Sequence, residues 1–266
     1  MNIWTKKSIE LANQKNYLDL LYKIYPMSVN LRRELSPEVE QLITNYFKNK
    51  KSKELLKTLL NQEIFPIKDS YVAYLKRDSS AIDRNPNTVE RLTGMLYEMG
   101  LDEIFDKTTV PKETNRQIGP LFKAWIDKGS LGCKVTHDEQ EFMSSSENII
   151  FNSSDAEMKN LAKNYLGYDR EKGLDFIAKF NDIFIIAEAK FLTDFGGHQN
   201  AQFDDAVSTM KSPMKASKYK VRKISILDGV LFIKSKNKMH TRLYNEFSDD
   251  EVIISAVLLR DFLYSL

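Results

Sequence analysis

Hydrophobic positions along the first 110 residues recur with the spacing of helices rather than that of strands. One such set follows Ser36-Pro37, where Ser can cap a helix and Pro suits its first position: Val39, Leu42, Ile43, Tyr46 and Phe47. A second set ends before Gly100, which predicts the end of that helix: Val89, Leu92, Met95, Leu96 and Met99. We therefore expect an all-helical domain over residues 1–110. Two short helices around Asp83–Pro86 are compatible with a helix-turn-helix that reads DNA or, more simply, with a plain helical bundle.

From residue 175 onward the pattern changes to short β-like runs. Two of them, 175–180 and 183–191, flank Asn181-Asp182, a pair typical of a tight hairpin turn. Three further strands are expected over residues 221–227, 230–233 and 252–258. Helices are expected over about 113–125, 154–166, 198–210 and 261–266. Helices alternating with strands indicate an α/β fold, which we assign to a second domain over residues 111–266.

Composition excludes several classes of protein. The chain has 266 residues with 42% hydrophobic, 29% charged, one Cys and three scattered His. These proportions suit a globular protein and exclude an internal disulfide or a zinc site built on Cys pairs. The most apolar run, 252–259, is too short to span a bilayer, and the first residues lack the apolar stretch of a secretory signal. We expect a cytoplasmic protein with no membrane partner.

The net charge of +2 conceals an uneven distribution. Residues 211–240 hold nine of the 39 Lys and Arg but a single one of the 37 Asp and Glu, Asp228. Such a concentration favours binding to a polyanion, although a solvated lysine face would have the same composition. The candidate contacts to a nucleic-acid backbone are Lys211, Lys215, Lys218, Lys220 and Arg222.

A carboxylate and an ammonium are paired on the second strand of the expected hairpin. Glu188 and Lys190 are two residues apart, so their side chains leave the strand on the same face. If Asn181-Asp182 form the turn, Asp175 lies directly opposite Glu188 and on that face too. The same Glu-x-Lys spacing at Glu157 falls on an expected helix, where residues two apart do not face each other.

The three groups have a composition suited to metal-assisted chemistry on a phosphodiester. Two carboxylates at the end of a buried strand are costly unless a cation compensates them. Mg²⁺ prefers such oxygen ligands, completed by water and a phosphate oxygen. Lys190 beside them can orient a water molecule or stabilise charge that builds on phosphorus. An ordinary cross-strand ion pair of Asp175, Glu188 and Lys190 is the simpler alternative.

At these residues the sequence resembles the PD-(D/E)XK nucleases, and in particular the type II restriction endonucleases of that superfamily. The similarity is most specific in 173–178 and 188–199, and it extends to 113–120, 227–230 and 258–263. It covers roughly residues 110–266. Leu174 stands where the signature has Pro, a residue that supplies no ligand.

The resemblance implies a mixed central β-sheet flanked by helices, with a restriction-endonuclease-like core. It also implies that Asp175 and Glu188 bind Mg²⁺, that the Ala189 carbonyl adds a ligand, and that Lys190 assists the attacking water. Glu157 matches an upstream helix carboxylate that contributes to the outer shell of the metal site in many of these nucleases. Its capping-box position explains the residue equally well.

Residues after the second strand are candidates for DNA contacts. Gln199, Asn200 and Gln202 lie in or near the first turn of the expected helix, where a phosphate can bind and amides can read adenine edges. Gln199 with Phe203 also resembles a Gln-x-x-x-Tyr element of some of these nucleases. The alternative is a polar helix start with Phe203 in the core. Arg116 is a further candidate, for DNA contact or for bracing its loop.

We expect from these features a type II restriction endonuclease, a Mg²⁺-dependent and sequence-specific hydrolase of double-stranded DNA in a prokaryotic cytoplasm. Cutting both strands of a symmetric site implies a homodimer. The resemblance alone implies a cognate DNA methyltransferase as functional partner. Two alternatives stay open: a structure-specific repair or junction nuclease of the same superfamily, and a non-enzymatic DNA-binding protein.

Overall fold

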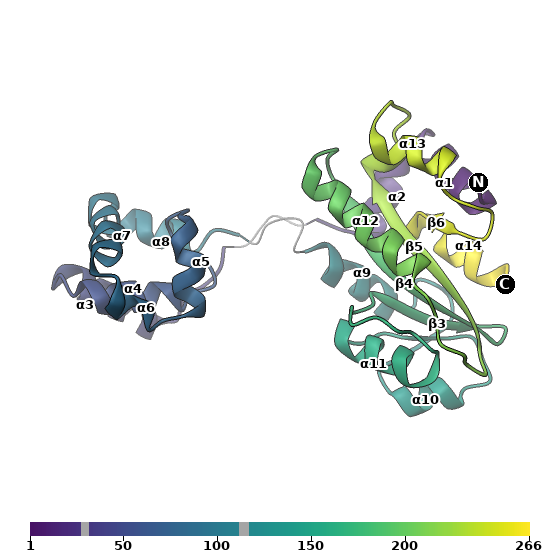
Figure 1. The fold of residues 1–266 in the computed structure, drawn as a ribbon, viewed down its shortest axis with the longest axis horizontal. Coiled ribbons are helices and arrows are strands. Elements are labelled where there is room, and N and C mark those ends of the chain that lie inside the picture. The colour runs from purple at the N-terminus through teal and green to yellow at the C-terminus, as the bar shows by residue number, and fades with distance from the viewer. Residues whose placement is uncertain (28–31, 112–116) are drawn as a thin grey trace. The chain divides into compact units, whose positions relative to one another are not determined.

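The computed structural model describes residues 1–27, 32–111 and 117–266, which form two compact units (Figure 1). Met1–Met27 and Thr114–Leu266 together make one unit, here called the sheet unit. Ser28–Glu113 makes the other, here called the helical unit. The expected boundary near residue 110 therefore differs from the structure in one respect, because Met1–Met27 belongs with the sheet.

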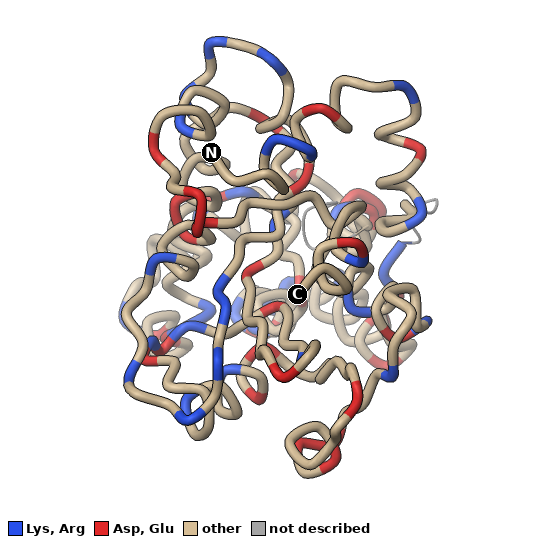
Figure 2. Tube along the Cα trace, turned by 90° about the vertical axis from the view of Figure 1, so that its right-hand side faces the viewer, with Lys and Arg blue, Asp and Glu red and all other residues tan. Residues whose placement is uncertain are grey.

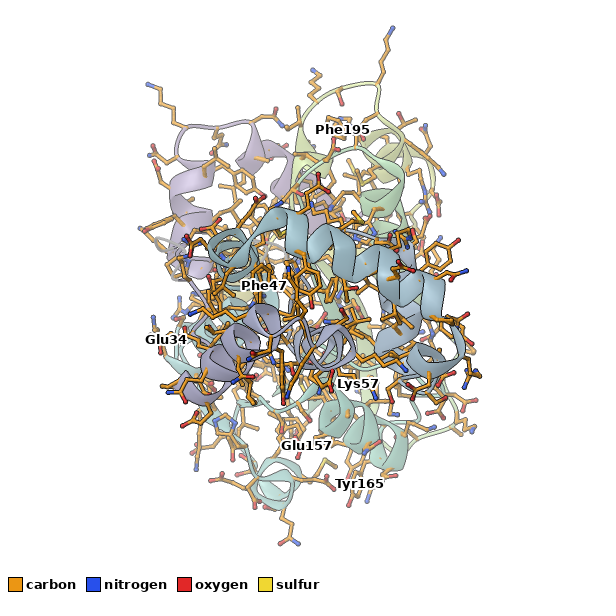
Figure 3. All side chains as sticks on the ribbon, turned by 90° about the vertical axis from the view of Figure 1, so that its left-hand side faces the viewer. Glu34, Phe47, Lys57, Glu157, Tyr165 and Phe195 are labelled. Atoms are coloured by element: carbon orange, nitrogen blue, oxygen red, sulfur yellow. The ribbon has the colours of Figure 1, made fainter. Side chains whose placement is uncertain are left out.

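In its described residues the helical unit consists of helices without strands. They are α3 (Pro37–Lys48), α4 (Ser52–Leu60), α5 (Ser70–Arg77), α6 (Ala81–Arg84), α7 (Pro86–Met99) and α8 (Leu101–Thr108). Ser36 caps α3, since its hydroxyl accepts from the Val39 N–H at 3.4 Å. Leu55, Leu56 and Leu59 of α4 are fully buried in the small core that the helices share. Phe47 and Lys57 mark this unit in Figure 3.

The sheet unit is built on six strands in the spatial order β1 to β6. They are β1 (Lys134–Thr136), β2 (Ile149–Phe151), β3 (Phe176–Phe180), β4 (Ile183–Leu192), β5 (Lys220–Gly229) and β6 (Val252–Ile254). β3 is antiparallel to β2 and β4, whereas the pairs β1–β2, β4–β5 and β5–β6 are parallel. The sheet is therefore mixed.

Helices cover both faces of this sheet. On one face Ile177 and Ile186 share a core with Met158 of α11. On the other, Phe176 packs against Phe122 of α9, with ring centroids 6.4 Å apart. The helices are α1 (Ile3–Ala12), α2 (Tyr17–Ile24), α9 (Ile118–Asp127), α10 (Glu139–Ser144), α11 (Asp155–Tyr165), α12 (Gly197–Lys211), α13 (Lys238–Asn245) and α14 (Leu259–Tyr264), with 3₁₀ turns η2 (Val230–Phe232) and η3 (Ala256–Leu258). The expectation of a mixed sheet flanked by helices is confirmed. None of the helices in the described ranges is long and apolar enough to cross a membrane.

The hairpin β3–β4 has the turn and register expected from the sequence. Phe180 pairs with Ile183, and the ladder continues to Phe176 opposite Ala187. Asn181 and Asp182 adopt left-handed conformations, with φ of 46° and 61°. Such a turn matches the natural twist of the two strands, and Asn and Asp are among the few residues that tolerate it.

Two expectations about the last third of the chain are wrong. Residues 230–233 do not form a strand, because β5 ends in a close turn at Gly229, where φ is 97°. A Cβ there would lie 2.0 Å from the Leu192 carbonyl oxygen, so glycine lets the chain turn against β4 and enter η2. β6 stops at Ile254 and is followed by η3, not by four more strand residues. The short β1 and β2, and α13, carry too little periodicity to be anticipated.

The N-terminal helices belong to the sheet unit because they satisfy its polar groups. The hydroxyl of Thr5 accepts from the Ile253 N–H at 3.2 Å, and that of Ser8 accepts from the Ser255 N–H at 2.9 Å. Ile253 lies in β6, the last strand in the sheet order, and Ser255 directly follows that strand. Helix α1 thus covers a strand edge that would otherwise present unpaired N–H groups.

Helix α2 is attached to the sheet through the buried carboxylate of Asp228. Tyr25 donates to it at 2.9 Å, and the hydroxyls of Tyr17 and Ser255 and the Ala256 N–H also donate. Burial raises the pKa of Asp228 to about 6, although the hydrogen bonds from Ser255 and Tyr25 oppose this. Burial, with the nearby Asp228 charge, raises the pKa of Tyr25 well above its usual value, so its hydroxyl keeps the proton it donates.

We expect Tyr25→Phe to lower the free energy of unfolding by about 1.5–3 kcal/mol, the usual value of a hydrogen bond to a charged group. Urea denaturation of the full chain measures this loss. Tyr22→Phe, on the same helix but with a side chain exposed to solvent, is the matched control and should change stability by less than about 0.5 kcal/mol. Equal stability of the two variants would show that Asp228 does not anchor α2.

Candidate active site

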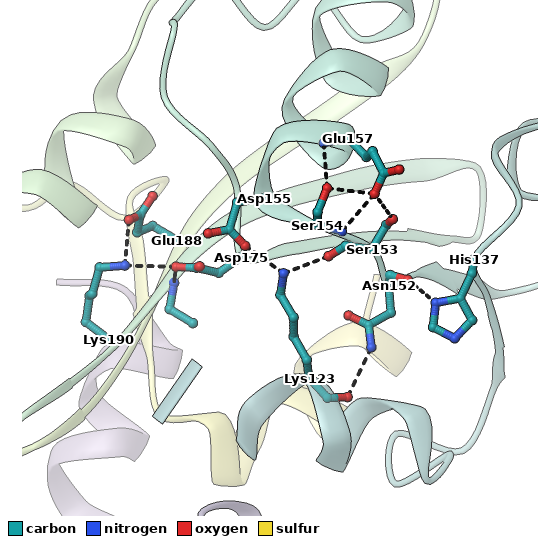
Figure 4. A network of polar contacts seen from close by, with 11 residues as sticks. Lys123, His137, Asn152, Ser153, Ser154, Asp155, Glu157, Asp175, Glu188 and Lys190 are labelled. Carbon is teal, nitrogen blue, oxygen red and sulfur yellow. Dashed lines mark hydrogen bonds and ion pairs between the residues drawn. The ribbon is translucent and has the colours of Figure 1, made fainter. Parts of the chain in front are cut away.

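The hairpin carries three charged residues to one face of the sheet. Glu188 and Lys190 lie two apart on β4, and Asp175 lies just before β3. The strand ladder ends one pair earlier than expected, so the Asp175 N–H donates to the Ala187 carbonyl at 3.0 Å instead of pairing with Glu188. Their side chains nevertheless converge, as Figure 4 shows.

A single ammonium joins the two carboxylates. Lys190 Nζ lies 2.6 Å from Glu188 Oε1 and 2.9 Å from Asp175 Oδ2. The same Asp175 oxygen accepts from the Ala189 backbone N–H at 2.8 Å. Asp175 and Glu188 are therefore close enough to share one cation.

Burial and the neighbouring charges shift the pKa values of Asp175 and Lys190. Glu188 is 3% exposed. Burial raises the pKa of Asp175, Lys190 lowers it, and the Glu188 charge raises it further, with an upward net shift. For Lys190 burial alone would lower the pKa, but the Asp175 and Glu188 carboxylates outweigh burial and raise it. The lysine therefore stays charged while it bridges the two acids.

Two more charged residues belong to this cluster and were not predicted from the sequence. Lys172 Nζ lies 2.9 Å from Glu188 Oε1 and also pairs with the Asp205 carboxylate on α12. Lys172 lies in the loop before β3 and Asp205 in mid-helix, so neither belongs to a motif that spacing alone would reveal. With them the cluster holds three carboxylates and two ammoniums, an excess of negative charge.

The donor set of this cluster fits a divalent cation with few protein ligands. Glu188 Oε2 is buried and has no hydrogen-bond partner in the described part of the chain. An unpaired buried carboxylate oxygen is costly unless a cation or a donor binds it. Across the residues described, no group of three or more His, Cys, Asp or Glu could hold a metal ion. A cation here would use Asp175 and Glu188 and complete its shell with the Ala189 carbonyl, water or substrate oxygens.

Glu157 is engaged at the start of α11. Its carboxylate accepts from the Ser153 hydroxyl and from the Ser154 hydroxyl and N–H, and the Ser154 hydroxyl accepts in return from the Glu157 N–H. The hydrogen bonds from Ser153 and Ser154 lower the pKa of Glu157 to about 2. Figure 4 shows Glu157 directed toward these serines rather than toward Asp175. The capping-box interpretation is confirmed, and an outer-shell role stays a prediction.

The loop between β4 and α12 accounts for two of the candidate DNA-reading residues. Gln199 is buried, and its Oε1 accepts from the Thr193 N–H at 3.1 Å. Asn200 donates to the Phe195 and Gly196 carbonyls at 2.8 and 3.0 Å. Both amides therefore support the loop, at whose outer part Phe195 lies (Figure 3). Phe203 is fully buried, as the core interpretation predicted.

Gln202 is partly exposed, and its Nε2 lies 3.2 Å from the His198 Nε2. Arg116 lies outside the described residues.

The basic segment 211–240 does not form one patch. Lys220 pairs with Ile183 at the start of β4, seven positions from Lys190, or about 23 Å along the strand. Lys218 and Arg222 lie at that same distant end, whereas Lys211 pairs with Glu246 and Glu251 and Lys215 with Asp169. Figure 2 shows Lys and Arg interleaved with Asp and Glu along much of the chain.

Three other lysines of the segment lie at the site's end of the sheet: Lys234, Lys236 and Lys238. They follow Ile233, which lines a pocket of about 650 Å³ together with Phe191 and Thr193, just beyond Lys190 on β4. All three are exposed. They are basic residues of this segment that follow the end of β5 paired with the end of β4.

The chain as a whole matches a known family. The site brings two acids and a lysine together near the end of β4. Residues 2–266 match the family model described as Tsp45I type II restriction enzyme. The chain therefore belongs to the Tsp45I type II restriction enzyme family, a family of DNA endonucleases. Neither a curated protein nor a solved structure matches it.

We expect Gln199→Ala to lower the free energy of unfolding by about 1–2 kcal/mol, because the Thr193 N–H loses its acceptor. The variant should keep the fragment pattern of the parent on DNA, since the amide supports the loop. Thermal unfolding and digestion of one DNA substrate measure the two effects. Gln202→Ala is the control, with no loss of stability. A changed fragment pattern with unchanged stability would make Gln199 a base-reading residue instead.

Proposed function

We propose that this protein is a Mg²⁺-dependent endonuclease of the PD-(D/E)XK type that cuts double-stranded DNA at a fixed sequence. The observation that carries the proposal is a pair of carboxylates, the buried Glu188 and the partly buried Asp175, bridged by Lys190 near the end of β4. Membership of a type II restriction enzyme family supports the substrate and the reaction class.

The three side chains divide the work of phosphodiester hydrolysis. Asp175 and Glu188 would hold the cation, with the Ala189 carbonyl as a further ligand. Bound there, Mg²⁺ supplies Lewis acidity and neutralises charge on the phosphate oxygens. Lys190 keeps its proton, so it orients the attacking water and stabilises negative charge that develops on phosphorus. The water would attack phosphorus in line and lose a proton to solvent, while the opposite deoxyribose oxygen departs and takes up a proton.

Contacts to DNA would come from the end of the sheet that carries these residues. Lys234, Lys236 and Lys238 are exposed there and suit phosphate contacts, which orient a duplex but do not specify sequence. Gln202 is available for a base edge. The helical unit would add further contacts to the DNA backbone or to base edges.

The described residues of one chain hold one such cluster, whereas a double-strand cut at a symmetric site needs two. We therefore propose a homodimer. A methyltransferase that protects the same sequence would be its functional partner.

Plasmid DNA incubated with the protein and Mg²⁺ should give discrete fragments. Chelation with EDTA should abolish cutting, and Glu188→Ala and Lys190→Ala should each lower the rate at least about 10³-fold, since each removes charge from the reacting centre. Lys179→Ala is the matched control: this lysine lies on the same sheet face but near the hairpin turn, where it binds the Ser145 carbonyl.

Other outcomes would point elsewhere. Variants at Glu188 and Lys190 that cut like the parent would refute the proposed site. Cutting that follows DNA structure and not sequence would favour a repair or junction nuclease. DNA binding without any cutting, over several cations, would favour a non-enzymatic protein.

Mixing the parent with an excess of Lys190→Ala protein tests the dimer. Mixed dimers have one competent site, so we expect open-circular plasmid, nicked in one strand, to accumulate at the expense of linear product. Gel electrophoresis over a range of mixing ratios measures this. A ratio of nicked to linear DNA that stays constant as inactive chain is added would argue that each chain acts alone.

A further inference from the structure

Lys172 is not part of the nuclease signature, and its side chain contacts two elements, β4 and α12. It lies in the loop before β3, three residues ahead of Asp175, and its ammonium contacts Glu188 Oε1 at 2.9 Å and the Asp205 carboxylate of α12. Its side chain is 24% exposed, so the charge is largely sheltered from water. Ion pairs in such surroundings are much less screened than those on an open surface.

The loop backbone holds Lys172 in place. The Leu174 N–H donates to the Asp155 carbonyl at 3.2 Å, at the start of α11. A Cβ on Gly173 would lie 2.7 Å from the Asp155 Cβ, so this close approach requires glycine beside Lys172. Helix α11 therefore restrains the loop beside Lys172 through the backbone of Gly173 and Leu174, and α12 restrains the Lys172 side chain.

The two oxygens of Glu188 have different surroundings. Oε1 receives both ammoniums, from Lys172 and Lys190, whereas the buried Oε2 has no hydrogen-bond partner in the described ranges. Turning the carboxylate plane away from its present orientation would break both ion pairs. With Lys190 alone, one of these restraints would be lost.

We propose that Lys172 is a positioning residue for this reaction: it fixes Oε1 of Glu188 and thereby leaves Oε2 to bind the divalent cation. Asp205 anchors the lysine in that role. The proposal rests on the proposed function, since it assumes that Glu188 holds a metal. It assigns to Lys172 no contact with the reacting atoms.

Electrostatics alone predicts the opposite effect, which makes the proposal testable. The cluster already has more carboxylates than ammoniums, so removing the Lys172 charge would strengthen the attraction for a cation if charge were all that mattered. If the lysine positions Glu188, its removal weakens cation binding. Groups that orient a ligand in this way typically contribute 10–100-fold to metal affinity or activity.

The test is a calorimetric titration of the full chain with Mn²⁺ in the absence of DNA. We expect Lys172→Met to weaken binding about 10-fold or more, Asp205→Asn to weaken it by less, and Lys172→Arg to restore it within about 3-fold of the parent. Lys163→Met is the matched control, because Lys163 pairs with Glu171 of the same loop and should leave Mn²⁺ binding unchanged. Thermal unfolding of each variant identifies any loss of fold; if Lys172→Met does not fold, Lys172→Gln, which also removes the charge, takes its place in the test.

Cleavage and DNA binding complete the test. At a Mg²⁺ concentration below saturation, Lys172→Met should lower kcat about 10–100-fold, while its affinity for DNA in Ca²⁺ stays within about 3-fold of the parent. Unchanged or tighter Mn²⁺ binding by Lys172→Met, with a parent that binds Mn²⁺ and cuts DNA, would overturn the positioning role and leave the proposed function intact. A parent that neither binds Mn²⁺ nor cuts DNA would overturn both, because Glu188 would then hold no metal. If the parent cuts DNA but binds Mn²⁺ only in its presence, the Mg²⁺ dependence of cleavage by parent and variant makes the same comparison.

Discussion

Asn181 and Asp182 set the register of the β3–β4 hairpin, and the location of every charged group in the site depends on that register. A shift by one residue would carry Glu188 and Lys190 to the opposite face of the sheet and separate them from Asp175. The left-handed turn prevents such a shift, because it fixes Phe180 opposite Ile183. The apolar residues of β4 act in the same direction, since both faces of the strand are buried. Site and fold therefore depend on one short turn.

Ion pairing offsets much of the free-energy cost of burying the Glu188 carboxylate. A carboxylate as deeply buried as that of Glu188 would be strongly destabilising by itself. Two ammoniums offset its charge, yet they leave one of its oxygens without a partner. The protein thus keeps an incompletely satisfied acid at the end of a rigid strand, where neighbouring elements hold it. Incomplete satisfaction of this kind is common at sites that bind ions or reacting groups.

Local patterns in the sequence were sufficient for the hairpin, the capping box at Ser154 and the convergence of Asp175, Glu188 and Lys190, because each depends on neighbours in the chain. Contacts between distant segments were not accessible in this way. Thr5 and Ser8 have the character of ordinary helix residues, and only the fold brings their hydroxyls to the backbone N–H groups of Ile253 and Ser255. Lys172 and Asp205 join the site for the same reason, and residues 230–233 have the composition of a strand but follow the turn at Gly229.

The basic segment shows what a linear charge count misses. A strand that is continuous in sequence separates its ends in space, so a run of lysines that includes β5 contributes to both ends of the sheet. In the proposed function, the lysines at one end alone can reach the DNA strand being cut. The cluster itself carries an excess of negative charge and would repel a phosphodiester. A cation bound beside Glu188 reverses that repulsion, so metal and DNA would favour each other's binding at this site.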